Sequence, residues 1–264
     1  MVRLDGRVAV VTGGGRGIGR GIAEVLVREG ATVVIADIDL ANAERSAAEL
    51  TAAGRRVSVV RCDVTDGEST QHAVDLAIAQ HGRVHIIVNN AGVVGKHVGG
   101  SQIDEADFDW CYEVNVKGIW LMTKAVVPHF KNSGGGRVVN IASIAGRTGG
   151  AGMAHYNASK AAAINLTRSL AIDLGPSNVN VNAVCPGLLW TDMWRSLEGM
   201  FNRTADPDVV ERRALFESYL AQHCPLRREQ TPEDIGNAVA FFASDDAKNI
   251  TGQSLNVDGG IEMD

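Results

Sequence analysis

The chain has 264 residues, of which 45% are hydrophobic and 21% are charged, so it can bury a large core and is neither disordered nor fibrous. Its 25 Lys and Arg residues against 31 Asp and Glu residues give a net charge of -6, which disfavours a nucleic-acid partner or an acidic membrane surface and favours a small-molecule ligand. No apolar stretch approaches the roughly 18 residues of a membrane-spanning helix and residues 1–7 carry no basic leader, so we expect a soluble, cytoplasmic protein.

Short β-branched apolar runs alternate along the chain with segments of helical periodicity. Continuous apolarity in such runs is typical of strands that are covered on both faces. The alternation predicts an α/β fold with a doubly wound parallel sheet of the Rossmann type, as one domain over residues 1–264. The predicted strands are residues 7–11, 32–36, 56–60, 84–88, 137–141, 179–184 and 254–257.

A glycine-rich turn follows the first predicted strand and leads into a helix marked by Ile18 and Ile22. Such a turn offers unpaired N–H groups and the positive end of the helix dipole to a pyrophosphate. The residues of the turn that we expect at the cofactor are Gly13, Arg16, Ile18 and Gly19. A strand before the turn, a helix after it and an acidic residue at the end of the next strand together indicate a dinucleotide site.

That acid is Asp37, whose carboxylate can accept hydrogen bonds from ribose hydroxyls and would repel a 2′-phosphate. No Arg or Lys follows it in residues 38–41, so the sequence favours NAD over NADP. The alternative for Asp37 is a strand-end turn or a helix cap.

The third and fourth predicted strands end in polar and small residues that would face the same cleft. Asp63 is placed to accept from the adenine amino group and Val64 to cover the ring, whereas Ala91 and Gly92 let the backbone approach the cofactor. Asn90 belongs to the same strand end. Each of these is weak alone, because strand-end turns are common.

Ser143 follows the fifth predicted strand, and Tyr156 and Lys160 come soon after it, four residues apart and so on one face of a helix. A phenol has a pKa near 10, and a neighbouring ammonium lowers that value toward the range useful for acid-base work. A surface Tyr and Lys one turn apart is the alternative, and Ser143 at a strand end facing the same cleft weighs against it.

With these motifs the sequence resembles the short-chain dehydrogenase/reductase family over essentially its whole length. The motifs are Thr12 to Gly19, Asn89-Asn90-Ala91-Gly92, Asn115, Ser143, Tyr156-Asn157-Ala158-Ser159-Lys160, Pro186-Gly187 and Asn256-Val257-Asp258-Gly259-Gly260. The resemblance implies a homotetramer that transfers hydride between a nicotinamide and a carbonyl or alcohol carbon.

The resemblance also implies a role for each motif residue. Tyr156 is the acid-base group, Ser143 bonds the reacting oxygen, and Lys160 lowers the tyrosine pKa and holds the nicotinamide ribose. Asn115 anchors a water behind Lys160. Around the nicotinamide and its phosphates the resemblance places Pro186, Gly187, Leu189 and Thr191.

The segment of about residues 188–222 is expected to form a substrate loop. Its Trp190, Met193, Trp194, Leu197 and Phe201 fall on one helical face, as a cover over the cleft or as a stripe packed on the core. The polar residues near the same mouth are Lys96, His97, Arg147 and His155, which could contact hydroxyls or a carboxylate of the substrate. The simpler interpretation of each is solvated loop surface.

We predict an NAD-dependent enzyme acting on a secondary alcohol, diol or polyol. The alternatives are a 3-oxoacyl-thioester reductase and a non-catalytic dinucleotide-binding regulator, and the intact Ser143, Tyr156 and Lys160 weigh against the regulator. The cysteines, Cys62, Cys111, Cys185 and Cys224, are far apart, so we expect reduced, buried thiols and no metal site.

Overall fold

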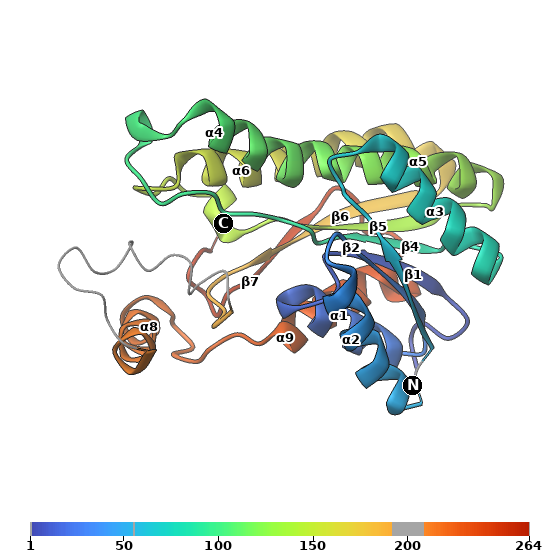
Figure 1. Cartoon of the computed structure of the whole chain (residues 1–264), viewed down its shortest axis with the longest axis horizontal. Coiled ribbons are helices and arrows are strands. Elements are labelled where there is room, and N and C mark those ends of the chain that lie inside the picture. The colour runs from blue at the N-terminus through green and yellow to red at the C-terminus, as the bar shows by residue number, and fades with distance from the viewer. Residues whose placement is uncertain (1, 55, 192–208, 264) are drawn as a thin grey trace.

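One parallel sheet of seven strands organises the protein, in a computed structural model that describes residues 2–54, 56–191 and 209–263 (Figure 1). The strand order is β3-β2-β1-β4-β5-β6-β7. The strands are β1 (Val8–Thr12), β2 (Thr32–Asp37), β3 (Val57–Arg61), β4 (Ile86–Asn89), β5 (Gly136–Ile141), β6 (Val179–Pro186) and β7 (Ser254–Val257). Each predicted strand is present within two residues of its expected ends, and the predicted fold class is confirmed.

Helices cover both faces of the sheet. In Figure 1, α3, α4, α5 and α6 lie on one side of it, and α1, α2 and α9 lie on the other. Their bounds are α1 (Gly17–Arg28), α2 (Leu40–Ala52), α3 (Gly67–His81), α4 (Glu105–Tyr112), α5 (Gly118–Asn132), α6 (Ala154–Leu174), α8 (Val209–His223) and α9 (Pro232–Ala243). The short helical turns are η1 (Gly100–Gln102), η2 (Glu113–Lys117), η3 (Ile144–Gly146), η4 (Gly175–Ser177) and η6 (Asp245–Ala247).

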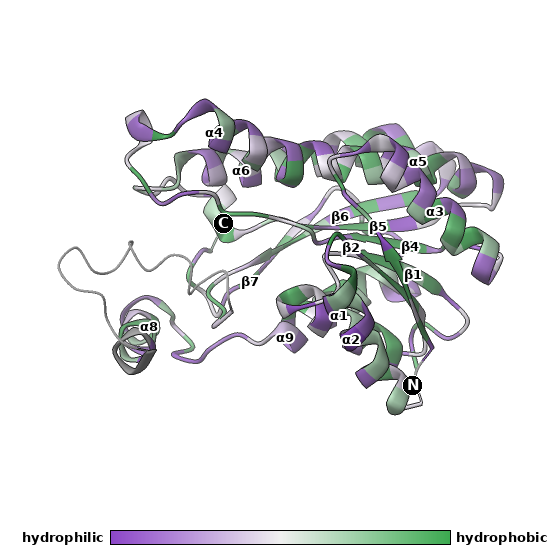
Figure 2. Cartoon of the chain, in the orientation of Figure 1, coloured by the Kyte–Doolittle hydropathy of each residue, from purple (hydrophilic) through white to green (hydrophobic). Residues whose placement is uncertain are grey.

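The strands contribute side chains to two separate hydrophobic cores, because successive side chains of a strand point to opposite faces of the sheet. In β1, Ala9 and Val11 pack with α1, α2 and α9, whereas Val8 and Val10 pack with α3, α5 and α6. Both faces are therefore apolar, which is why the strands read as continuous apolar runs (Figure 2).

The strand order reverses between β1 and β4, which are neighbours in the sheet although β2 and β3 lie between them in sequence. Ligands of open α/β sheets bind beyond the carboxyl ends of the strands at such a switch point. The glycine-rich turn after β1 and the Asn90 segment after β4 both lie there. Among the described residues, no helix is long and apolar enough to cross a bilayer.

Candidate active site

The glycine-rich turn runs tightly from β1 into α1. Gly13 has φ +61°, in the left-handed region that favours glycine. A Cβ on Gly19 would press into the Gly13 carbonyl group, so only glycine lets α1 start this close to the turn. Arg16 is the N-cap residue, and no described side chain caps the first N–H groups of α1. The helix end therefore fits a pyrophosphate, which needs free N–H donors.

Asp37 ends β2 beside this turn and is buried. Its Oδ2 accepts from the Gly15 N–H at 2.9 Å, and its Oδ1 accepts from the Asp39 N–H at 3.0 Å. A carboxylate has about four acceptor sites, so two remain for ribose hydroxyls. The carboxylate thus stabilises the turn and still has acceptor sites free for the hydroxyls of an NAD ribose. These residues therefore fit the dinucleotide.

Asn90 holds the turn from the β4 side. Its Nδ2 donates to the carbonyl oxygens of Thr12 and Gly13 at 2.9 and 3.0 Å. The Thr12 hydroxyl in turn accepts the N–H groups of Asn90 and Ala91 at 3.0 and 3.1 Å. The sequence predicts Asn90 at the cofactor. In the structure its side-chain amide donates its hydrogen bonds to the backbone of the glycine-rich turn. The part played by Thr12 was not anticipated, although it opens the motif.

The end of β3 is shaped by Asp63, whose Oδ1 accepts from the N–H and hydroxyl of Thr65 at 2.9 and 2.7 Å. Val64 is buried, and a Cβ on Gly118 would touch its side chain. Gly92 lies close to Lys160, since a Cβ there would lie 3.3 Å from Lys160 Nζ. These strand ends therefore gather around one region, as the parallel sheet predicts.

Ser143, Tyr156 and Lys160 converge from β5 and α6. Ser143 follows β5 and its Oγ accepts from the Ala145 N–H at 3.1 Å, which leaves its own proton to donate. Tyr156 is 9% exposed and Lys160 is 4% exposed. Lys160 Nζ lies 5.7 Å from the centre of the Tyr156 ring and donates to the Ile141 carbonyl oxygen at 3.0 Å.

Burial dominates the acid-base properties of this group. It raises the pKa of Tyr156 to about 12, and a hydrogen bond from Ser143 opposes that rise. Burial also lowers the pKa of Lys160 to about 8. The expectation that the ammonium would lower the tyrosine pKa is wrong for these side chains, because desolvation of the phenolate outweighs any attraction by Lys160.

Asn115 lies in the π-helical turn η2, and its side chain links this turn to the segment after β4 and to α6. Its Oδ1 accepts from the Val93 N–H at 2.8 Å, and its Nδ2 donates to the Val93 carbonyl oxygen at 2.8 Å and to Ser159 Oγ at 3.0 Å. Ser159 Oγ donates to the Tyr156 carbonyl oxygen at 2.8 Å. Both amide protons are used, so the side chain could hold a water only through the remaining lone pair of Oδ1.

The segment after β6 begins at Pro186 and Gly187. A Cβ on Gly187 would strike Asp258 and Gln230, so glycine lets this turn lie close to both of them. Leu189 is buried in the core, and Thr191 N–H donates to its carbonyl oxygen at 2.9 Å.

Trp190 packs against Phe216 of α8 with ring centres 5.2 Å apart. Met193, Trp194, Leu197 and Phe201 lie outside the described residues, so the substrate loop over 188–222 stays a prediction.

Two of the polar residues expected as loop surface are structural. Arg147 is tied to β7, since its Nε donates to Asn256 at 2.6 Å and its Nη2 to the Ser254 carbonyl oxygen at 2.8 Å. His155 is fully buried, with Nε2 3.1 Å from Asp107 Oδ2. Their reading as solvated surface is wrong, because neither the tether to β7 nor the position of Asp107 on α4 can be seen in sequence.

Lys96 is exposed and paired with Asp104 at 2.5 Å. Its N–H donates to the same Asp107 Oδ2, at 2.8 Å. His97 packs against Gly152. Among the described residues, no group of three or more His, Cys, Asp or Glu could hold a metal ion.

Fold and site together define an oxidoreductase built on a dinucleotide-binding sheet. A family model described as Enoyl-(Acyl carrier protein) reductase matches residues 13–262. The chain is 42% identical to 4-formylbenzenesulfonate dehydrogenase of Comamonas testosteroni, over 98% of this chain and 99% of that protein. It is 38% identical to galactitol 2-dehydrogenase of Agrobacterium fabrum, over 99% of this chain and 100% of that protein.

A solved structure of 7α-hydroxysteroid dehydrogenase complexed with NADH and 7-oxo glycochenodeoxycholic acid superposes with a TM-score of 0.88 at 37% identity, covering 98% of this chain and 95% of that one. The chain belongs to the short-chain dehydrogenase/reductase family. The predicted membership and the predicted oxidoreductase class are confirmed.

Proposed function

We propose that the protein is an NAD-dependent dehydrogenase that interconverts a secondary alcohol, diol or polyol and the corresponding ketone. The observation that carries this proposal is the convergence of Ser143, Tyr156 and Lys160 in one buried group beside Gly92. Relatives named for galactitol and for a hydroxysteroid support an alcohol as substrate. When bound, the nicotinamide gives or accepts the hydride.

Tyr156 would supply the proton. With its pKa raised to about 12, the phenol is protonated at neutral pH and can donate to the carbonyl oxygen of a ketone. In the oxidative direction the Tyr156 oxygen takes the hydroxyl proton back, so turnover of an alcohol should rise toward alkaline pH. Ser143 donates a hydrogen bond to the same substrate oxygen, and Lys160 lies beside the Tyr156 ring, held there by its hydrogen bond to the Ile141 carbonyl oxygen.

NAD is favoured over NADP by Asp37. The side chain is fixed by two backbone N–H groups, so it cannot easily turn away from a 2′-phosphate. The neighbour complexed with NADH agrees with this choice. Cofactor contacts are proposed for the glycine turn, Asp37, Asp63, Val64, Gly92 and the segment from Pro186 to Thr191.

The test is a panel of polyols, diols, cyclic alcohols and β-keto thioesters assayed with NAD(H) and NADP(H). Tyr156→Phe should lower kcat by roughly 10²- to 10⁴-fold while NAD still binds. Tyr112→Phe is the matched control, because it removes a phenol hydroxyl on α4. Turnover of the β-keto thioesters alone would favour the 3-oxoacyl-thioester reductase alternative, and near-normal turnover by Tyr156→Phe would refute the role of Tyr156.

Assembly and compartment are part of the same proposal. Phe108 and Trp110 on α4 and Trp120 on α5 are exposed, which supports a homotetramer formed through these helices. All four cysteines are free and buried, which fits the reducing cytoplasm. Light scattering should give the mass of a tetramer, and Trp110→Glu should reduce it.

A further inference from the structure

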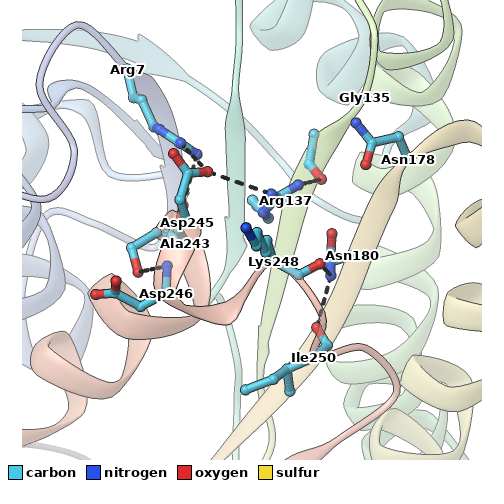
Figure 3. A network of polar contacts seen from close by, with 12 residues as sticks. Arg7, Gly135, Arg137, Asn178, Asn180, Ala243, Asp245, Asp246, Lys248 and Ile250 are labelled. Atoms are coloured by element: carbon cyan, nitrogen blue, oxygen red, sulfur yellow. Dashed lines mark hydrogen bonds and ion pairs between the residues drawn. The ribbon is translucent and has the colours of Figure 1, made fainter.

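A polar cavity of about 370 Å³ lies at the amino ends of the strands, opposite the glycine-rich turn. Its walls come from the residues just before β1, β4, β5 and β6 and from η6 after α9. Figure 3 shows Arg7 and Arg137 reaching toward Asp245 in this region. The carboxyl ends of the strands hold the candidate active site, so this cavity is a separate place on the molecule.

Three arginines and two aspartates line the cavity: Arg7, Arg83, Arg137, Asp5 and Asp245. Arg7 is well paired, with Nη2 2.6 Å from Asp245 Oδ1 and Nη1 donating to the Ala243 carbonyl oxygen at 3.1 Å. Arg137 Nη2 lies 3.8 Å from the same Asp245 oxygen, too far for a hydrogen bond. One carboxylate is thus shared unequally between two guanidinium groups.

Arg137 is the poorly compensated cation. It is 9% exposed, its Nη1 donates only to the neighbouring Gly136 carbonyl oxygen at 3.1 Å, and its Nε has no acceptor among the described residues. Burial and the nearby charge of Arg7 lower the pKa of Arg137, and the carboxylate of Asp245 opposes that lowering. Arg83 is similar, since its Nη2 reaches the Gly135 carbonyl oxygen only at 3.5 Å and its Nε lacks an acceptor in the same described ranges.

His85 adds a donor without adding charge. Its Nδ1 accepts the Val8 N–H at 3.0 Å, so the proton is on Nε2. Burial, together with the charges of Arg83, Arg7 and His129, lowers the pKa of His85 to about 4, and the ring is neutral at physiological pH. The cavity therefore has more hydrogen-bond donors than acceptors.

We propose that this cavity binds a small phosphate anion, free or as the phosphate group of a metabolite. The guanidinium fork matches the spacing of phosphate oxygens, and a phosphate would give Arg137 and Arg83 the acceptors they lack. The volume suits one small ligand. Asp245, whose side chain is 74% exposed, is the internal acceptor with which the anion competes.

The test is calorimetric titration of the protein with inorganic phosphate and with glycerol 3-phosphate at low ionic strength, since salt screens such charges. We expect one site per chain that persists when NAD⁺ is in excess, because the glycine turn lies at the opposite, carboxyl ends of the strands. Tighter binding of glycerol 3-phosphate would identify a metabolite, and equal or weaker binding would identify the free ion. Both outcomes support the site.

Three variants decide whether the arginines form it. Arg137→Gln should weaken phosphate binding about tenfold or more, whereas Arg28→Gln, on an exposed arginine paired with Glu233, should not change it. Asp245→Asn should tighten binding several-fold, an effect that damage to the fold cannot produce. No binding by the unmodified protein, loss of binding in excess NAD⁺, or weaker binding by Asp245→Asn would overturn the proposal.

Discussion

Replacing Lys160 by Met should make the protein more stable while abolishing its activity. The pKa of Lys160 falls from 10.5 to about 8 on burial, and each pKa unit corresponds to about 1.4 kcal/mol, so its charge costs the folded state about 3 kcal/mol at neutral pH. Met also leaves the Ile141 carbonyl oxygen without its donor, at about 1 kcal/mol or more.

The expected net gain at pH 7 is about 1 to 2 kcal/mol. For a chain of this size that raises Tm by about 2 to 6 °C. Lys131→Met is the control, because Lys131 is exposed at the end of α5 and should leave Tm nearly unchanged.

The pH dependence separates burial of charge from better packing. The folded pKa of Lys160 lies below its unfolded value, so the unmodified protein gains stability from this group as pH rises from about 8 to 10.5 and loses it as pH falls through 8. The Tm advantage of Lys160→Met should therefore shrink over that range. Tyrosine ionisation is common to both proteins and cancels in the difference. A variant that melts lower at pH 7, or a Tm difference that does not change with pH, would refute the reasoning.

Two further predictions concern the cofactor and the buried pair beside Tyr156. Asp37→Asn should lower the ratio of kcat/KM for NAD to that for NADP by about tenfold, since it removes the charge that repels a 2′-phosphate, and an unchanged ratio in steady-state assays would contradict the role of Asp37. Asp107→Ala should lower stability by about 1 to 3 kcal/mol, because it removes the carboxylate beside buried His155 and the acceptor of the Lys96 N–H, and an unaltered melting curve would show that the pair is not needed.

The order of the strands and helices, and the places of the candidate site residues within that order, can be predicted from local sequence patterns. A continuous apolar run such as β1 is typical of a strand that is buried on both faces of a sheet. The run can be recognised from neighbouring residues alone. The motifs around Gly13, Asp37 and Tyr156 are likewise contiguous, so their place at strand ends and helix starts follows from the chain alone.

The hydrogen-bond partner of each polar side chain depends on the folded arrangement, because those partners lie far away in sequence. Asn90 turns to the glycine loop 77 residues earlier, and Arg147 to β7 more than a hundred residues later. The pKa of Tyr156 likewise depends on how completely other segments exclude water from it, and no spacing of residues encodes that. The arginine cavity is assembled from strand ends that only the finished sheet brings together, which is why it left no motif in the sequence.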